Sequence, residues 1–135
     1  MKVENAVYPA PAGIQALGQD SSSTKIAMLN LLKFRDKAIY KDGRPDDISG
    51  REAYQRYATP MTKIVEREGG RVLFAGKIAG LVIGEVGQLW DLAAIMEYPS
   101  RAAFQRIVTL PEVAQISVHR EAGLEGQLLI MTESL

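Results

Sequence analysis

A strand–helix–strand pattern occurs twice along this sequence of 135 residues, and it constrains the fold more than any other feature. Each copy has an apolar strand-like segment, a long amphipathic segment and a second strand-like segment. These segments are residues 26–34, 49–68 and 71–78 in the first copy, and 89–98, 100–121 and 128–132 in the second. Two such units in tandem predict a ferredoxin-like α+β sandwich, in which two helices cover one face of a four-stranded sheet.

The length of the chain allows one domain and is too short for two ordinary ones. No low-complexity segment divides it, so we expect an N-terminal extension over residues 1–24 and a single α+β domain over residues 25–135. Two prolines precede residues 12–17 and Gly18 follows them, which predicts a short helix in the extension. The serines at 21–23 predict a loop.

Three residues predict how the long helical segments begin and where they are interrupted. Ser49 and Glu52 have the spacing of a capping box, which starts a helix. Pro60 lacks the amide hydrogen that the preceding turn needs, so we expect either a kink or two abutting helices there. Pro111 predicts a restart within the second helical segment.

The first strand, residues 26–34, is apolar at both its even and its odd positions, so we expect both of its faces to be covered. The predicted helices cover only one face. The other would expose apolar surface on the order of several hundred Å², about the limit for a soluble monomer. A second copy packed on this face predicts a homodimer. The alternative is a monomer whose odd-position residues lie under the glycine-rich stretch 80–87.

The composition excludes several classes of function. Sixteen basic residues balance sixteen acidic ones, which gives no charged surface for nucleic acid or an anionic membrane. The chain has no cysteine and one histidine, which excludes thiolate and multi-histidine metal sites, and no loop has the ligand spacing of a calcium or magnesium site. With no signal peptide or membrane-spanning segment in the sequence, we expect a cytoplasmic protein.

Two aromatic residues and one amide could line a ligand site in the sheet. Asn30 is the polar residue in the middle of an apolar strand face, so it either bonds a neighbouring backbone group or faces a wet cavity. Trp90 and Tyr98 lie at the two ends of another apolar strand face. They could line a ligand cavity or belong to the core with their polar tips at its edge.

His119 and Arg120 lie near the end of the second helical segment. His119 is the side chain that titrates near neutral pH, which suits general acid–base work, whereas a cation there would also stabilise the helix C-terminus. Arg120 falls on the inward stripe of its helix, so we expect its side chain to be partly buried and its guanidinium to need an anion. That anion is either an internal carboxylate, Asp91 or Glu97, or one that a ligand brings.

Five ordered segments of the chain resemble the bacterial domain-of-unknown-function 1330 family, which belongs to the dimeric α+β-barrel superfamily. These segments are residues 30–34, 50–57, 69–73, 98–104 and 119–124. The resemblance covers most of the chain from Lys25 onward and implies a ferredoxin-like subunit whose sheet pairs with a second copy to form a barrel. The chain departs from the family pattern at Val113, where many relatives carry a tyrosine after Pro-Glu.

The resemblance implies a range of functions rather than one reaction. The wider superfamily contains cofactor-free monooxygenases, isomerases and dehydratases as well as binding or regulatory modules. We therefore expect either a dimer that binds a small organic ligand, with or without cofactor-independent catalysis, or a non-catalytic module that binds a metabolite or a protein. The candidate catalytic residues are His119 and Tyr54, and the candidate ligand-binding residues are Asn30, Trp90, Tyr98 and Arg120; no metal or cofactor is expected.

Overall fold

The computed structural model describes residues 1–18, 24–45 and 47–135. The helices and strands in these ranges are α1 (Pro11–Gly18), β1 (Ile26–Phe34), α2 (Gly50–Arg67), β2 (Arg71–Lys77), β3 (Leu92–Tyr98), α3 (Arg101–Val108), α4 (Pro111–Gly123) and β4 (Leu124–Glu133). The short helix predicted in the N-terminal extension is present as α1. The serine loop predicted at 21–23 lies outside the described residues.

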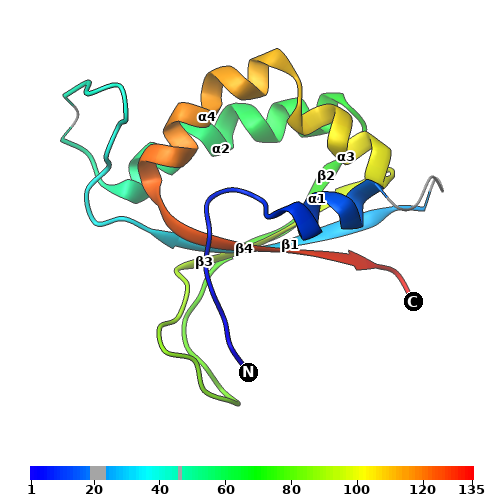
Figure 1. Cartoon of the computed structure of the whole chain (residues 1–135), viewed down its shortest axis with the longest axis horizontal. Helices are drawn as coiled ribbons and strands as arrows, with labels where there is room; N and C mark the ends of the chain where they lie inside the picture. Colours follow the sequence, from blue (N-terminus) through cyan, green and yellow to red (C-terminus); the bar gives the residue numbers. More distant parts are fainter. Residues whose placement is uncertain (19–23, 46) are drawn as a thin grey trace.

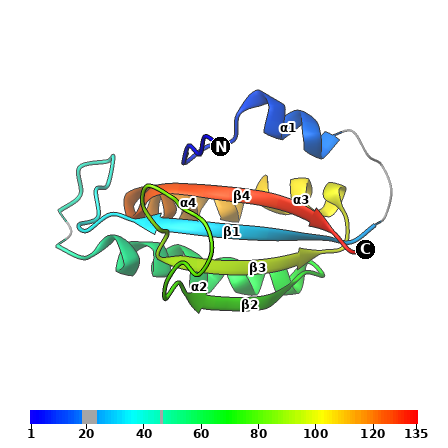
Figure 2. The ribbon, with the colours of Figure 1, turned by 90° about the horizontal axis from the view of Figure 1, so that it is seen from below.

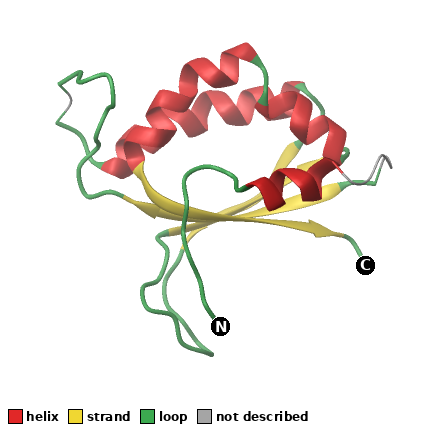
Figure 3. Ribbon diagram, in the orientation of Figure 1, coloured by secondary structure: helices red, strands yellow, loops and turns green. Residues whose placement is uncertain are grey.

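The strands form one sheet in the order β2-β3-β1-β4, and each neighbouring pair is antiparallel. Helices α2, α3 and α4 lie together on one face of this sheet (Figure 1), and Figure 3 shows the separation into a helical layer and a strand layer. The predicted ferredoxin-like arrangement of two βαβ units is therefore confirmed. A single chain leaves the sheet open at β2 and β4, so one copy does not close a barrel.

Helix α2 begins where the sequence predicts. The Ser49 hydroxyl accepts a hydrogen bond from the Glu52 amide at 3.0 Å, and the Glu52 carboxylate accepts one from the Ser49 amide at 3.2 Å. The helix then continues through Pro60 to Arg67, so the alternative of two abutting helices is wrong. Buried residues lie both before and after Pro60, so both halves of the helix pack in the core despite the missing backbone hydrogen bond.

Strand β3 begins at Leu92, three residues later than predicted. The reason lies in Asp91, whose carboxylate accepts a hydrogen bond from the Phe34 amide at 2.8 Å. This side-chain contact replaces the next backbone bond of the sheet, and the pairing of β1 with β3 ends at Leu32 and Leu92. Trp90, predicted to open this strand, consequently lies in the preceding loop.

Strand β4 begins at Leu124, four residues earlier than predicted. Helix α4 starts at Pro111, which confirms the predicted restart, and passes into β4 without an intervening loop. Leu124 already has extended backbone angles, with φ −87° and ψ 127°, and it pairs with Phe34 of β1. Gln127 is therefore a residue of the strand rather than of a connecting loop.

The two faces of β1 have different environments. Its even-numbered residues point toward the helices, and Ile26, Met28 and Leu32 are almost completely buried there. Its odd-numbered residues point to the other face of the sheet, which is covered by no helix of the described chain and which we call the open face. The apolar residues of the open face include Leu29, Leu31, Phe74, Ile95 and Ile130.

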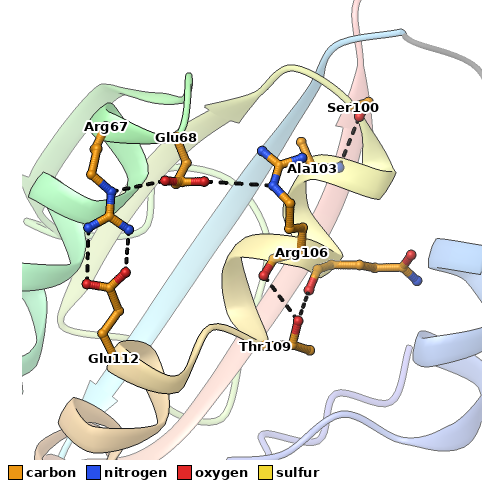
Figure 4. A network of polar contacts seen from close by, with 8 residues as sticks. Arg67, Glu68, Ser100, Ala103, Arg106, Thr109 and Glu112 are labelled. Atoms are coloured by element: carbon orange, nitrogen blue, oxygen red, sulfur yellow. Dashed lines mark hydrogen bonds and ion pairs between the residues drawn. The ribbon is translucent and has the colours of Figure 1, made fainter.

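A network of charged side chains joins the end of α2 to α3 and α4 (Figure 4). The Arg67 guanidinium contacts both carboxylate oxygens of Glu112, and its Nε donates to Glu68 at 3.0 Å. Glu68 also lies 3.8 Å from Arg106. Hydrogen bonding to Arg67 lowers the pKa of the Glu112 carboxyl. The network is exposed, so it helps to fix the order of the helices but contributes little to stability.

The N-terminal extension runs along the outer edge of the sheet. Ala6 pairs with Gln127 through two backbone hydrogen bonds of 3.1 and 2.7 Å. Helix α1 lies beyond β4 in Figure 2, and the Arg101 side chain donates to the Ala16 carbonyl at 2.9 Å. The extension therefore covers part of an edge that would otherwise present unpaired backbone groups.

Candidate functional site

The structure distributes the six predicted site residues over three places. Asn30, Tyr54, Tyr98 and Arg120 belong to the layer between the sheet and the helices. His119 lies next to the loop that connects β1 to α2, and Trp90 lies beside the N-terminal segment. In the first group, Arg120 and Asn30 are connected through polar contacts with Gln127, a residue that the sequence did not point to.

Arg120, Gln127 and Asn30 form a chain of hydrogen bonds that we call the amide relay. Arg120 Nη2 donates to Gln127 Oε1 at 2.6 Å, and Gln127 Nε2 donates to Asn30 Oδ1 at 2.8 Å. The Asn30 amide group in turn donates to the backbone carbonyls of Met28 at 3.2 Å and Ala94 at 3.4 Å. Because a guanidinium can only donate, the orientation of both side-chain amides is fixed.

Gln127 is the residue that the sequence analysis missed. Gln127 is buried, with 9% of its surface exposed, and its side chain joins Arg120 to Asn30. Strand β4 was predicted to begin at residue 128, so Gln127 fell just outside it and was not considered part of the sheet. A strand that begins at Leu124 places Gln127 opposite Leu32, on the face that points toward the helices.

The Arg120 guanidinium has no carboxylate partner among the described residues. Asp91 pairs instead with Lys33 at 3.2 Å, and Glu97 pairs with Arg71 at 3.1 Å. The internal ion pair considered for Arg120 is therefore absent from the described part of the chain. One of the five N–H groups of the guanidinium is used by Gln127, and the side chain is half-buried.

Two tyrosines of α2 lie near Arg120. Burial raises the pKa of Tyr54 and of Tyr57, and the positive charge of Arg120 acts on both in the opposite direction. Their rings lie 5.5 Å apart, and the Tyr54 ring lies 5.4 Å from Phe34. Neither hydroxyl forms a hydrogen bond with another described residue. Both phenols therefore remain protonated at neutral pH, and each hydroxyl can donate a hydrogen bond to a ligand.

Tyr98 belongs to the core. Its side chain is buried, and its ring packs edge-on against Phe104 at 4.9 Å. Burial raises the pKa of Tyr98, and the nearby Tyr57 acts in the same direction. Tyr98 thus borders the group of aromatic side chains around Arg120 from the sheet side.

His119 is engaged by a different part of the chain. Its Nδ1 lies 2.8 Å from the hydroxyl of Tyr40, and the two rings meet edge to face at 5.6 Å. Tyr40 is buried in the loop between β1 and α2. Consecutive residues of a helix point about 100° apart, so the contact with Tyr40 directs His119 away from the side on which Arg120 meets Gln127.

Trp90 donates a hydrogen bond from its indole Nε1 to the Asn5 side chain at 2.7 Å. It borders a groove of about 400 Å³ between the N-terminal segment and residues 85–88. A larger groove, of about 540 Å³, lies at the end of β1 and is lined by charged side chains that include Lys33, Arg35 and Arg51. No residue of the amide relay lines either groove.

The described ranges, residues 1–18, 24–45 and 47–135, hold neither a metal-ligand cluster nor a membrane-spanning helix. No group of three or more histidine, aspartate or glutamate residues there could hold a metal ion. Nor does any helix in those ranges have the length and apolar character that a membrane span requires.

Comparison with known proteins gives a family and a fold. A family model described as "Domain of unknown function (DUF1330)" matches residues 44–134. Two crystal structures of RPA0582, one of them the methylated protein, are 33% and 31% identical to this chain, each with a TM-score of 0.87. The methylated form covers 97% of this chain and 96% of its own; the other, described as of unknown function from Rhodopseudomonas palustris, covers 98% of both.

The fold also resembles that of a more distant protein, which is an enzyme. SnoaB, a cofactor-independent oxygenase from Streptomyces nogalater, has a TM-score of 0.54 at 11% identity, covering 83% of this chain and 94% of its own. At that identity the likeness is one of fold alone. No curated protein matches the chain.

Proposed function

The chain belongs to the domain-of-unknown-function 1330 family, and from that starting point we propose that it is a homodimer that binds a small organic anion at Arg120. The ligand would be a carboxylate or an enolate held between the helices and the sheet. The observation that carries the proposal is that the half-buried Arg120 guanidinium is held by a neutral amide and has no carboxylate partner among the described residues.

The charge of Arg120 supports an anionic ligand. A cation that is partly removed from water is costly unless an anion or several hydrogen bonds compensate it. Among the described residues, Gln127 alone accepts a hydrogen bond from the guanidinium, so most of its N–H donors have no acceptor there. A carboxylate matches such a fork with two parallel hydrogen bonds, so it would compensate both the charge and the unused donors.

The two phenols of α2 support the same class of ligand. Because burial raises their pKa values, Tyr54 and Tyr57 stay neutral and can donate hydrogen bonds at physiological pH. Together with Arg120 they make a neighbourhood rich in donors. Such a neighbourhood favours oxygen atoms that carry negative charge and disfavours a cationic ligand.

Binding is supported more strongly than acid–base catalysis. A general base needs a pKa near the working pH, whereas the pKa values of the phenols near Arg120 are shifted away from it. The Nδ1 of His119 is engaged by the Tyr40 hydroxyl, away from Arg120. The second candidate function is cofactor-independent catalysis of the kind that the description of SnoaB states for that protein. In it, Arg120 and Tyr54 would stabilise an enolate by donating hydrogen bonds.

Replacing Arg120 by methionine tests the anion site. We expect benzoate, salicylate, acetoacetate or 2-oxoglutarate to stabilise the wild-type protein, by about 2.7 kcal/mol at a concentration 100 times its Kd. Arg120→Met should abolish this stabilisation. It should change the stability of the ligand-free protein by only about 1 kcal/mol, because it leaves one amide oxygen unpaired and no buried carboxylate. Thermal unfolding with and without each compound measures both quantities.

The matched control is Arg106→Met, which removes an exposed guanidinium far from the relay and should leave the ligand response unchanged. A loss of about 3–5 kcal/mol from the ligand-free Arg120→Met protein would instead indicate a buried ion pair. Such a loss, or no response of the wild-type protein to any of the four compounds, would contradict the proposed site.

The open face supports the homodimer. It exposes Phe74 and Ile130, and the odd-numbered leucines of β1 lie between them. Sheets that pack face to face bury such residues, and a closed two-fold pair is the commonest way for a single kind of chain to do so. Met28, on the other face of β1, is buried beneath the helices and is not available to a partner.

Replacing Leu31 by aspartate tests the dimer. We expect a native mass of twice the 14.8 kDa of one chain for the wild-type protein at micromolar concentration. Leu31→Asp should raise the dissociation constant about 100-fold or more, because a two-fold axis places two carboxylates in the interface. Ile39→Asp, an exposed apolar site in the loop between β1 and α2, should leave the mass unchanged. A folded wild-type monomer would refute the dimer.

A further inference from the structure

Residues 78–91 connect β2 to β3 and stand away from the sheet on its open side, and we call them the arm. In Figure 1 the arm projects in the direction opposite to the helices, alongside the N-terminal segment. The arm thus emerges from the same side of the molecule as the apolar residues of the open face. Whatever covers that face must also meet the arm.

The end of the arm is apolar and exposed. Val82 and Ile83 expose 94% and 88% of their surface, and Leu81 exposes 48%. Gly84, which follows them, has a φ of 102°, a conformation that reverses the chain at little cost only for glycine. A loop that stays in water is normally polar at its tip. Three consecutive aliphatic residues at this position therefore indicate a surface that becomes buried.

The base of the arm is held firmly. The Ile78 amide donates to the Asp91 carbonyl at 3.0 Å, and the Asp91 amide donates to the Leu32 carbonyl at 2.7 Å. The Asp91 carboxylate is bonded to the Phe34 amide and to Lys33. Trp90 is tied to Asn5 of the N-terminal segment. With its base fixed in this way, the arm can present its tip without a large loss of conformational entropy.

The length of the arm exceeds the distance between two packed sheets. Half of its residues, fully extended, span about 20 Å, whereas sheets pack about 10 Å apart. The arm of one copy in a face-to-face dimer would therefore pass beyond the plane of the partner's sheet. Its tip would then lie against the side of the partner rather than between the two sheets.

The arms would also add area to an interface formed by the open face. Four strands about 4.8 Å apart, each about seven residues long, give a flat footprint of about 450 Å². A stable interface buries about 800 Å² per partner. The footprint is a projected area and is smaller than the accessible surface of the same patch, so the two values set only a scale. The exposed aliphatic side chains of two arms would enlarge the buried surface beyond what the sheets supply.

We propose that the arm of each copy clasps the second copy of the chain, with Val82 and Ile83 buried against the partner. This inference rests on the proposed homodimer and adds to it the segment that completes the interface. The occupant is a second copy because the arm is continuous with the face on which that copy would pack. A two-fold axis would also make the contact reciprocal, because the arm of each subunit would pack against the other subunit.

The absence of cysteine from the sequence allows a direct test. Val82→Cys introduces a single thiol at the tip, and Ile14→Cys introduces one in α1, where the side chain is 54% exposed. We expect a maleimide to react at least 10-fold more slowly with the first protein than with the second when both are dimeric. In a Leu31→Asp background, which separates the subunits, the two rates should become equal.

A paired substitution provides the second measurement. Val82→Ser with Ile83→Ser should raise the dissociation constant of the dimer about 100-fold, since four aliphatic side chains leave the interface. The fold of the single chain should not change, because both residues are exposed in it. Circular dichroism and native mass measured on the same sample separate the two effects.

The outcomes distinguish this inference from the dimer on which it rests. A wild-type monomer would refute the dimer. A wild-type dimer in which Val82→Cys reacts as fast as Ile14→Cys, and in which the paired serine substitution does not weaken assembly, would refute the clasp and leave the dimer standing. Slow labelling of Val82→Cys that persists in the Leu31→Asp background would also refute the clasp, since the tip would then be covered by something other than a second copy.

Discussion

Replacing Gly123 by alanine should cost the protein about 3 kcal/mol or more of its stability, a large part of the 5–15 kcal/mol that holds a domain folded. Gly123 ends α4 where that helix passes the start of α2. A Cβ atom at this position would lie 2.3 Å from the Gly50 carbonyl oxygen and 2.8 Å from the Tyr54 amide nitrogen. Both are backbone atoms, so neither can move aside without separating the two helices.

The same crossing makes Gly50 sensitive. A Cβ atom there would lie 2.1 Å from the Arg35 carbonyl oxygen and 2.7 Å from the Gly123 carbonyl oxygen. Urea unfolding of Gly123→Ala measures the loss, and Gly13→Ala is the control, since no atom of a described residue lies within 4 Å of its added Cβ. Alanine inside α1 should leave stability unchanged or slightly higher. A Gly123→Ala protein as stable as the wild type would show that the two helices are not in close contact.

The protein should unfold cooperatively above about pH 11, because the folded chain holds three tyrosines as neutral phenols with raised pKa values. Burial raises the folded-state pKa of Tyr54, Tyr57 and Tyr98 above the value of 10.0 expected in the unfolded chain. Their stabilising contribution is therefore complete below pH 10 and is lost as the pH rises further. Each tyrosine removes up to about 1.4 kcal/mol per pH unit in that range, and the three together remove about 4 kcal/mol per unit.

Tyrosinate absorbance and circular dichroism, followed together during an alkaline titration, measure this transition. The two signals should change at the same pH, because the phenols ionise when the chain unfolds. Tyr54→Phe and Tyr57→Phe should each move the midpoint upward at little cost at neutral pH, since neither hydroxyl bonds another described residue. Tyr8→Phe, at an exposed ring, should not move it. Ionisation of all tyrosines near pH 10 in a folded chain would contradict the burial.

The order of helices and strands could be predicted because the patterns that determine it are local. Apolar periodicity, the capping pair Ser49 and Glu52, and Pro111 each act within a few residues of where they stand. The ends of β3 and β4 could not be predicted in this way. They depend on a contact between Asp91 and Phe34, 57 residues apart in sequence, and on the passage of α4 into β4 without a turn.

The candidate site was predictable only in part for the same reason. Asn30 and Arg120 were identifiable because a polar or charged residue stands out on an apolar face. Gln127 stands beside a predicted strand rather than in it, so nothing in the sequence connected it with Asn30, which lies 97 positions earlier. His119 was identified by its chemistry, but its environment depends on Tyr40, which belongs to a loop without periodicity.

The amide relay has a consequence for the electric field of the molecule. If a carboxylate were paired with Arg120, the two charges would cancel and the pair would produce only the weak field of a dipole. Two uncharged amides hold the guanidinium in position and leave its full unit of positive charge in place. In a chain whose sixteen basic and sixteen acidic residues sum to zero, that charge is a fixed local source of attraction. An approaching anion would experience it before making any contact, and more strongly at low ionic strength.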